Sequence, residues 1–163
     1  MTNDEIELFN KRRKALARHI ENVRQNCEKL GEILIEKGEH EIGHRLIANG
    51  HCHDQSKWNG IEWLYLNEET REKTPELFSA ALLEHQKSNL HHPEAWPDGI
   101  HSMDRLHRAE MVCDWAARSS EFGTDLREYL KTKATKRFNI TIQSKAYREL
   151  KELMDLFLDP SFT

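Results

Sequence analysis

The strongest constraint on the fold is a helical repeat that begins near the start of the chain. Between Glu5 and Lys37, apolar residues recur at intervals of three, four or seven residues. This spacing is typical of an amphipathic helix with one buried face. Gly38 directly after the run is a typical helix stop. The sequence therefore predicts one long helix over this range.

Further helices are expected along the rest of the chain, separated by short breaking segments. Asn49-Gly50 is expected to end the second helix, and 138–142, the one strand-like piece, is too short for a sheet. A chain of 163 residues is long enough for one core. An all-α fold follows, with residues 1–163 forming a single helical domain of six to eight helices. The later helices are predicted near 39–48, 51–59, 61–67, 76–90, 102–119, 124–133 and 141–158.

Charge and cysteine content narrow the possible classes of function. The formal net charge of −4 disfavours generic nucleic-acid binding, which normally needs a basic surface. No stretch approaches the roughly 18 to 20 apolar residues of a membrane helix, and the N-terminus lacks an apolar signal core. The three cysteines are widely spaced and suggest no disulfide framework, so a cytoplasmic location is expected.

Histidine is the most distinctive residue type of the chain. Of ten histidines, seven lie between His44 and His101, and histidine is the commonest metal ligand and a frequent acid-base group. The pair His53-Asp54 is a weak signal alone, because such pairs arise by chance. Asp114, between Cys113 and Trp115, is expected to be partly buried, where a carboxylate needs a metal or an ion-pair partner. In chain order, the candidate set is His19, His53, Asp54, His85, His91, His92 and Asp114.

This ordered set resembles the HD-domain phosphohydrolase superfamily, which is all-helical and named for its central His-Asp pair. The family's early histidine, His-Asp pair and late aspartate fall on His19, His53, Asp54 and Asp114. The segment 53–57, His-Asp-Gln-Ser-Lys, is similar to the family's His-Asp-x-Gly-Lys variant. The run 91–99 is similar to the His-His-Glu-x-Trp-Asp-Gly run of the cyclic-dinucleotide branch, without that branch's Tyr-Pro. The chain also resembles a family of small helical phage and bacterial proteins that has no known activity.

The resemblance implies a site that uses a divalent metal ion to activate water. The four matched residues would be its ligands, and manganese, iron, zinc, magnesium and cobalt all remain candidates. Lys57 would contact a phosphate, while Glu84 and His85 would orient a ligand or carry a proton. The sequence leaves open whether His85, His91 and His92 bind a second ion or act as acid-base groups. The number of ions is therefore one or two.

The function implied by the resemblance is hydrolysis of a phosphate ester, with a nucleotide as the expected substrate. The His-His-Pro-Glu run favours, as an alternative, a phosphodiesterase that acts on a cyclic nucleotide or oligonucleotide. A reading from another class is a non-catalytic module that binds a nucleotide or a protein. The expected partner is a small phosphate compound rather than a membrane or generic nucleic acid, and a homo-oligomer is compatible with the sequence.

Overall fold

The computed structural model describes residues 2–159 and residue 161, and within them it contains helices and no strand. The predicted all-α fold is confirmed. α7, η4 and α8 form one continuous helical run, which gives eight helical segments in this part of the chain, within the predicted six to eight. The α-helices are α1 (Asn3–Glu36), α2 (His40–Cys52), α3 (Gly60–Tyr65), α4 (Glu68–Lys73), α5 (Pro75–Ser88), α6 (Arg105–Phe122), α7 (Leu126–Tyr129), α8 (Thr135–Arg137) and α9 (Lys145–Leu158). The 3-10 turns are η1 (Gln55–Trp58), η2 (Pro93–Ala95) and η3 (Gly99–His101), and η4 (Leu130–Ala134) is a π-helical turn.

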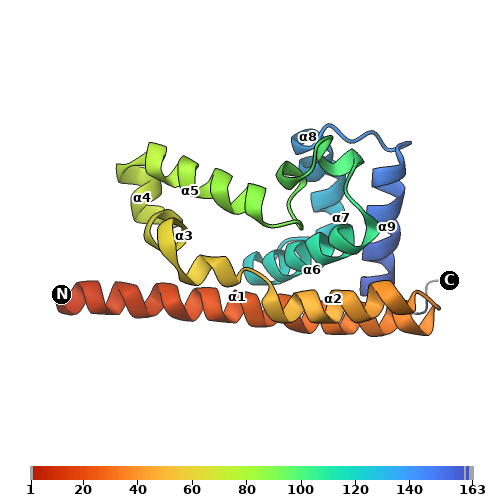
Figure 1. Cartoon of the computed structure of the whole chain (residues 1–163), viewed down its shortest axis with the longest axis horizontal. Coiled ribbons are helices and arrows are strands. Elements are labelled where there is room, and N and C mark those ends of the chain that lie inside the picture. Colours follow the sequence, from red (N-terminus) through yellow and green to blue (C-terminus); the bar gives the residue numbers. More distant parts are fainter. Residues whose placement is uncertain (1, 160, 162–163) are drawn as a thin grey trace.

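α1 is the base on which the rest of the molecule is built (Figure 1). α2 turns back after Gly38 and packs along the C-terminal half of α1, while α6 and α9 cover the same half from above. Their apolar faces meet in one core, in which Leu30, Leu34, Leu46 and Leu150 are completely buried. The long apolar stripe of α1 is therefore the main organiser of the core, as its periodicity predicts.

α1 and α2 approach each other closely because glycines line their contact. A Cβ atom on Gly43 would lie 2.5 Å from the backbone oxygen of Gly31 and 2.6 Å from Cγ1 of Ile35. A Cβ atom on Gly50 would lie 2.6 Å from Cβ of Cys27. Such distances cannot be accommodated without separating the two helices.

Replacing Gly43 with Ala is expected to destabilise the protein by about 2 kcal/mol, because overpacking against a backbone atom outweighs the gain of about 1 kcal/mol in helix propensity. Urea unfolding followed by circular dichroism would measure the change. The matched control is His44→Ala, at the next and exposed position of α2, which should stay within about 0.5 kcal/mol of the wild type. Equal stability of Gly43→Ala and the wild type would contradict this packing.

The predicted break at Asn49-Gly50 is wrong, because α2 continues through it to Cys52. Gly50 serves the close approach to α1 and not a turn. The helix ends at His53, and Asp54 follows with a left-handed φ of 55°, a conformation that aspartate tolerates better than most residues. The His-Asp pair therefore lies at a helix end, not on the helix predicted over 51–59.

The last helix begins later than the predicted position 141. The segment 138–142 forms no strand, as expected for so short a piece, and it lies between α8 and α9 as an irregular connection. α9 begins at Lys145 and is capped by the side chain of Ser144, which accepts a hydrogen bond from the Tyr147 backbone. Ile142, expected on the apolar face of the last helix, is 62% exposed.

α3, α4 and α5 form an arm over the N-terminal half of α1 (Figure 1). Within the described residues, the arm helices pack mainly against one another. The arm is joined to the rest of the molecule by η1 at one end and by the segment 89–92 at the other. Both connections carry or adjoin predicted site residues, so the position of the arm helps to set the geometry of the site.

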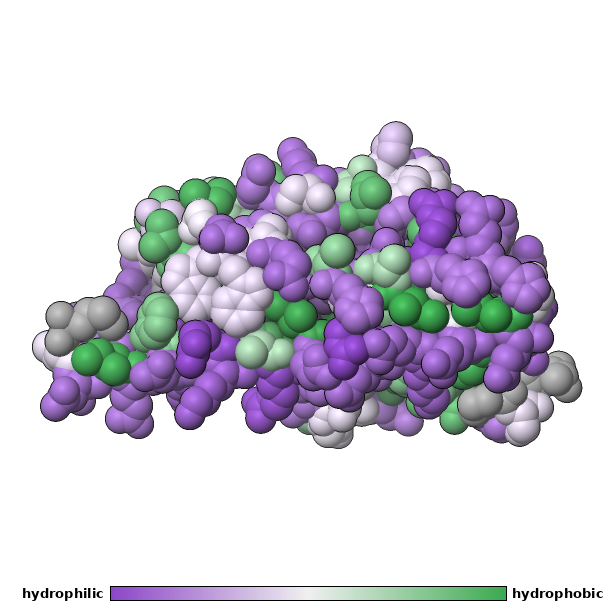
Figure 2. Space-filling model, turned by 60° about the horizontal axis from the view of Figure 1, so that its bottom comes forward, coloured by the Kyte–Doolittle hydropathy of each residue, from purple (hydrophilic) through white to green (hydrophobic). Residues whose placement is uncertain are grey.

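The face of the molecule seen in Figure 2 is largely hydrophilic. Figure 2 shows apolar side chains in small separate patches among hydrophilic ones. None of the helices in the described part of the chain combines the length and apolar character needed to cross a membrane.

Candidate metal centre

The structure brings all seven predicted metal ligands into one cluster. They come from the three helices α1, α5 and α6, from the turn after α2 and from the loop before η2, so residues far apart in sequence meet at one place. Three overlapping groups among them have ligand atoms within 4.8 Å of one another. The groups are Asp54, His85, His91 and His92; His19, His53 and Asp54; and His53, His91 and Asp114.

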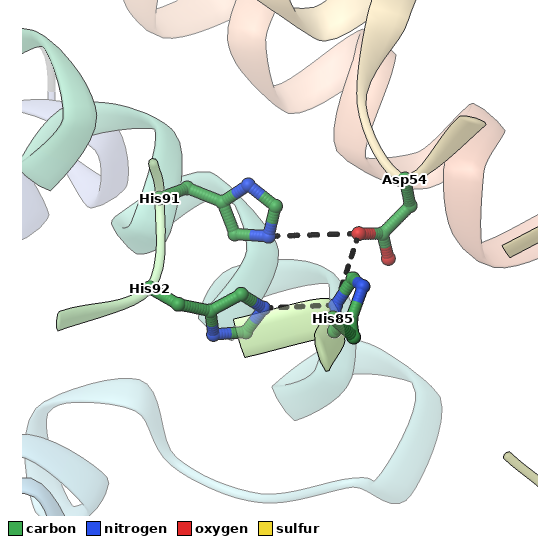
Figure 3. A group of neighbouring side chains, drawn as sticks. All are labelled: Asp54, His85, His91 and His92. Carbon is green, nitrogen blue, oxygen red and sulfur yellow. Dashed lines mark hydrogen bonds and ion pairs between the residues drawn. The ribbon is translucent and has the colours of Figure 1, made fainter. Parts of the chain in front are cut away.

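Asp54 lies at the middle of this cluster and presents one carboxylate oxygen to each side. Its Oδ2 is 3.8 Å from Nε2 of His19 and 3.5 Å from Nε2 of His53. Its Oδ1 is 3.4 Å from Nε2 of His85 and 3.5 Å from Nε2 of His91 (Figure 3). The left-handed backbone at Asp54 is the local feature that places this carboxylate between the two sets of histidines.

Asp114 and His92 complete the two sides of the cluster. Oδ1 of Asp114 is 3.1 Å from Nε2 of His19. On the other side, Nε2 of His92 faces Nε2 of His85 at 2.9 Å (Figure 3). Asp54 therefore lies between a set with His19, His53 and Asp114 and a set with His85 and His92, while His91 belongs to groups on both sides.

The inward-facing atoms are buried, and several have no hydrogen-bond partner among the described residues. A buried polar atom without a partner is costly, so such a group points to a missing ligand. Donor atoms bound to one ion at 2.0 to 2.2 Å are spaced about 3.0 to 3.5 Å apart, which is close to the separations found here. The unpartnered atoms are His19 Nε2, His53 Nε2, Asp54 Oδ1, His91 Nε2 and Asp114 Oδ1.

The outward-facing ring nitrogens are held by carboxylates. Nδ1 of His53 donates to Glu110 at 3.0 Å, and Nδ1 of His85 donates to Glu62 at 2.8 Å. Nδ1 of His19 donates to Glu121 at 3.0 Å. This arrangement fixes the proton on Nδ1 and leaves the Nε2 lone pair directed inward, as metal-binding histidines require.

The supporting carboxylates are themselves anchored. Glu110 accepts a further hydrogen bond from Asn49 Nδ2 at 2.9 Å, and Glu121 accepts one from Asn22 Nδ2 at 3.1 Å. Glu110, Asp114 and Glu121 share one face of α6, because offsets of 4 (114 − 110) and 7 (121 − 114) residues are close to whole helical turns. This spacing is the sequence signal that could have identified Glu121.

Electrostatics within the cluster favour a bound cation. Burial opposes ionisation of Asp54, but the charges of Lys57, His53 and His91 outweigh it and hold its pKa well below the usual range. Burial lowers the pKa of His85 and of His92 to about 3. Ionised Asp54 and neutral His85 and His92 are thus in the protonation states that bind metal ions. Burial opposes protonation of His53, but the charges of Asp54 and Glu110 outweigh it and raise the pKa of His53.

Lys57 and Glu84 were predicted beside the site and occupy different environments. Nζ of Lys57 lies 2.5 Å from Oδ2 of Asp54, so this ammonium group borders the metal cluster. Glu84 is exposed on α5 and lies outside the cluster. The orienting carboxylates are those of Glu62, Glu110 and Glu121. Of these, Glu62 carries no sequence signal beyond its type, because its role depends on how the arm packs.

Replacing Glu110 with Gln is expected to weaken metal binding about 10- to 100-fold. The imidazoles of His53 and His91, whose Nδ1 atoms lie 3.0 and 3.3 Å from Oε1 of Glu110, would lose their anionic partner. Competition with a chromophoric chelator would measure the dissociation constant. Glu84→Gln, which also removes one carboxylate but at an exposed position, should bind metal like the wild type. A similar affinity in both variants would show that Glu110 does not support the ligands.

The family model that matches this chain covers residues 9–159 and is described as a family of unknown function, DUF5662. The chain belongs to the DUF5662 family. All seven candidate ligands of this DUF5662 protein, and the three supporting glutamates, lie within the matched range. Comparisons with curated proteins and with solved structures gave no significant match. The buried histidine and aspartate groups of this DUF5662 chain are able to hold a metal ion.

Proposed function

We propose that this protein is a metal-dependent phosphohydrolase of the HD type that acts on a nucleotide or a related small phosphate ester. The observation that carries the proposal is the convergence of seven ligand residues in one cluster centred on Asp54, with unpartnered inner atoms and carboxylates behind the histidines. A cluster built only for stability would leave fewer buried polar atoms unpaired. The order of His19, His53, Asp54 and Asp114 along the chain also resembles that of the HD superfamily.

Two ions are the number that the geometry favours. Asp54 offers Oδ2 to the side of His19 and His53, and Oδ1 to the side of His85 and His91. A carboxylate in this position can bridge two ions. Imidazole-rich sets suit manganese, iron, cobalt or zinc, whereas magnesium prefers oxygen ligands.

A bound divalent ion of this kind lowers the pKa of coordinated water and polarises phosphoryl oxygens. Within the chain, Lys57 is the residue placed to bind the phosphate. Its ammonium group pairs with Asp54 and is partly exposed, with 19% of the side chain accessible. Lys57, His19 and His85 all line an open cleft, which gives a small substrate a path to the cluster.

The test is a substrate panel with protein loaded with manganese. Nucleoside mono-, di- and triphosphates and cyclic dinucleotides would be assayed for phosphate release and for ring opening. Release of phosphate from a nucleotide is expected, and Asp114→Asn should reduce it strongly. Ring opening of a cyclic dinucleotide without phosphate release would favour the phosphodiesterase alternative. If folded, metal-loaded protein turned over no member of the panel, the proposal would be wrong.

A further inference from the structure

The cleft that leads to the metal cluster has a volume of about 600 Å³ and lies between α1 and the arm. One end is formed by His19, Lys57 and His85. Away from that end its lining is largely apolar, with side chains from both α1 and the arm, among them Leu16, Trp63, Leu66, Phe78 and Leu82. A cleft of this size suits one small organic molecule rather than a polymer. The cleft is therefore the natural place for the organic part of the substrate.

Arg12 is a fixed cation in the wall of this cleft. Its guanidinium lies over the ring of Trp63, with Cζ 4.9 Å from the ring centroid, and Nη2 donates to the Trp63 backbone oxygen at 2.5 Å. These contacts use one N–H group and hold the rest of the planar guanidinium in place. Burial lowers the pKa of Arg12, although the charge of Glu69 opposes this. The guanidinium is thus partly desolvated and already oriented.

Arg12 and its neighbour Lys11 lack an ion-pair partner in the described part of the chain. Other charged groups along the cleft are paired. Lys57 pairs with Asp54, Arg118 with Glu121 at 3.1 Å, and Glu69 with Lys73 at 2.7 Å. Glu62 accepts from His85, and the remaining carboxylate of the lining, Glu68, is exposed on α4. Among the described residues, Lys11 and Arg12 are therefore cations of the lining that no carboxylate contacts directly. Glu62 and Glu68 balance the charge of the cleft as a whole.

This charge lies at a defined separation from the metal cluster. Arg12 and His19 are seven residues apart on α1 (19 − 12), so they share one face with about 10 Å between them along the helix axis. Leu16 lies between them on the same face and also lines the cleft. Along the cleft, the metal cluster is thus followed by the apolar wall and then by the cations Lys11 and Arg12.

We propose that Lys11 and Arg12 form a second anion-binding subsite, with Arg12 as a specificity-determining residue, and that the preferred substrate is a bis-anion. Its class is a phosphate ester of nucleotide size that carries a second phosphate or carboxylate beyond a flat or apolar middle part. Guanidinium groups bind both anions through paired hydrogen bonds. The inference deepens the proposed function and rests on it for the identity of the scissile group.

The experiment compares matched ligands that differ by one anionic group. The pairs are AMP with adenosine 3′,5′-bisphosphate, and phenyl phosphate with its 4-carboxy derivative and with 4′-carboxybiphenyl-4-yl phosphate. Dissociation constants would be measured calorimetrically in chelator, and kcat/KM with manganese. Comparing the bisphosphate with the carboxylated phosphates shows which second anion is preferred. The two carboxylated ligands differ in the distance between their phosphate and their carboxylate.

In the wild type, at least one bis-anion should bind about tenfold or more tightly than its mono-anion partner. Arg12→Ala should remove this preference, weakening bis-anion binding about 10- to 100-fold while changing mono-anion binding less than about twofold. Arg12→Lys should keep part of this preference, because lysine retains the positive charge but lacks the paired N–H donors of the guanidinium. The matched control is Arg13→Ala, exposed and outside the cleft lining, which should behave like the wild type.

Arg12 also anchors the arm, so Lys11→Gln serves as a second variant without an anchoring contact, and a partial loss of the preference is expected. An equal loss for mono-anions and bis-anions in Arg12→Ala, with no effect of Lys11→Gln, would show that Arg12 is only an anchor and overturn the inference. No preference for any bis-anion in the wild type would also overturn it. Preferred bis-anion binding without any hydrolysis would support the subsite while contradicting the proposed phosphohydrolase.

Discussion

If the proposed phosphate ester hydrolysis is correct, replacing Asp54 with Asn is expected to reduce it to background. A loss of at least about 1,000-fold is typical for one residue of a catalytic group whose members act together. Asp54 is the residue whose two oxygens face both sets of histidines. An amide of the same shape has one oxygen, no negative charge and a nitrogen that does not bind metal ions. The variant should therefore lose the bound metal together with the activity.

The assay would follow phosphate release with manganese, and far-UV circular dichroism would establish that the variant is folded. Asp98→Asn is a suitable control, because Asp98 is an exposed aspartate on the loop that follows His91 and His92. It should keep the activity and metal content of the wild type. Hydrolysis by Asp54→Asn within about tenfold of the wild type would mean that the reacting centre lies elsewhere.

Metal loading is expected to raise the thermal stability of the protein by about 5 to 15 °C. The stabilisation at 100 to 1,000 times the dissociation constant is about 2.7 to 4.1 kcal/mol, and each kcal/mol shifts the Tm of a domain of this size by about 2 to 4 °C. The structural reason is that bound ions satisfy the buried, unpartnered atoms of His19, His53, Asp54, His91 and Asp114.

Thermal unfolding in chelator and with manganese, cobalt, zinc or magnesium would measure this effect. The rise should be smallest with magnesium, because the site is rich in imidazole. Asp54→Asn should unfold at the same temperature with and without metal, whereas Asp98→Asn should show the full rise. An identical Tm for the wild type in chelator and with all four ions would argue against a metal centre.

The sequence predicted the candidate metal ligands well, but it predicted the carboxylates that orient them poorly. His19, His53, Asp54 and Asp114 could be selected because their order resembles a known pattern, and the structure does bring them together. Glu62 was missed because a carboxylate behind a histidine has no signature of its own. Glu121 was missed because its spacing from Glu110 and Asp114 indicates a shared helix face but not its histidine partner. Its role follows only from which helix faces which, and helical periodicity identifies a buried face but not its partner.

The backbone at Gly50 and at Asp54 is a second feature that the sequence did not predict. Asn49-Gly50 has the composition of a break, yet Gly50 is needed where α2 crosses Cys27 of α1. Local propensity cannot distinguish a glycine that turns the chain from one that lets two helices meet. The helix ends at His53 and Asp54 follows in a left-handed conformation. Local propensity favours neither position, so the place of the pair at a helix end could not be derived from the residues alone.

The metal-to-protein ratio tests the central claim most directly. Purified protein would be loaded with manganese, freed of unbound ions by gel filtration and analysed by inductively coupled plasma mass spectrometry, with Asp54→Asn in parallel. We expect close to two ions per chain in the wild type and a loss of both in the variant. Folded wild-type protein without a stoichiometric amount of any metal offered, or with the same metal content as Asp54→Asn, would contradict a metal centre bridged by Asp54.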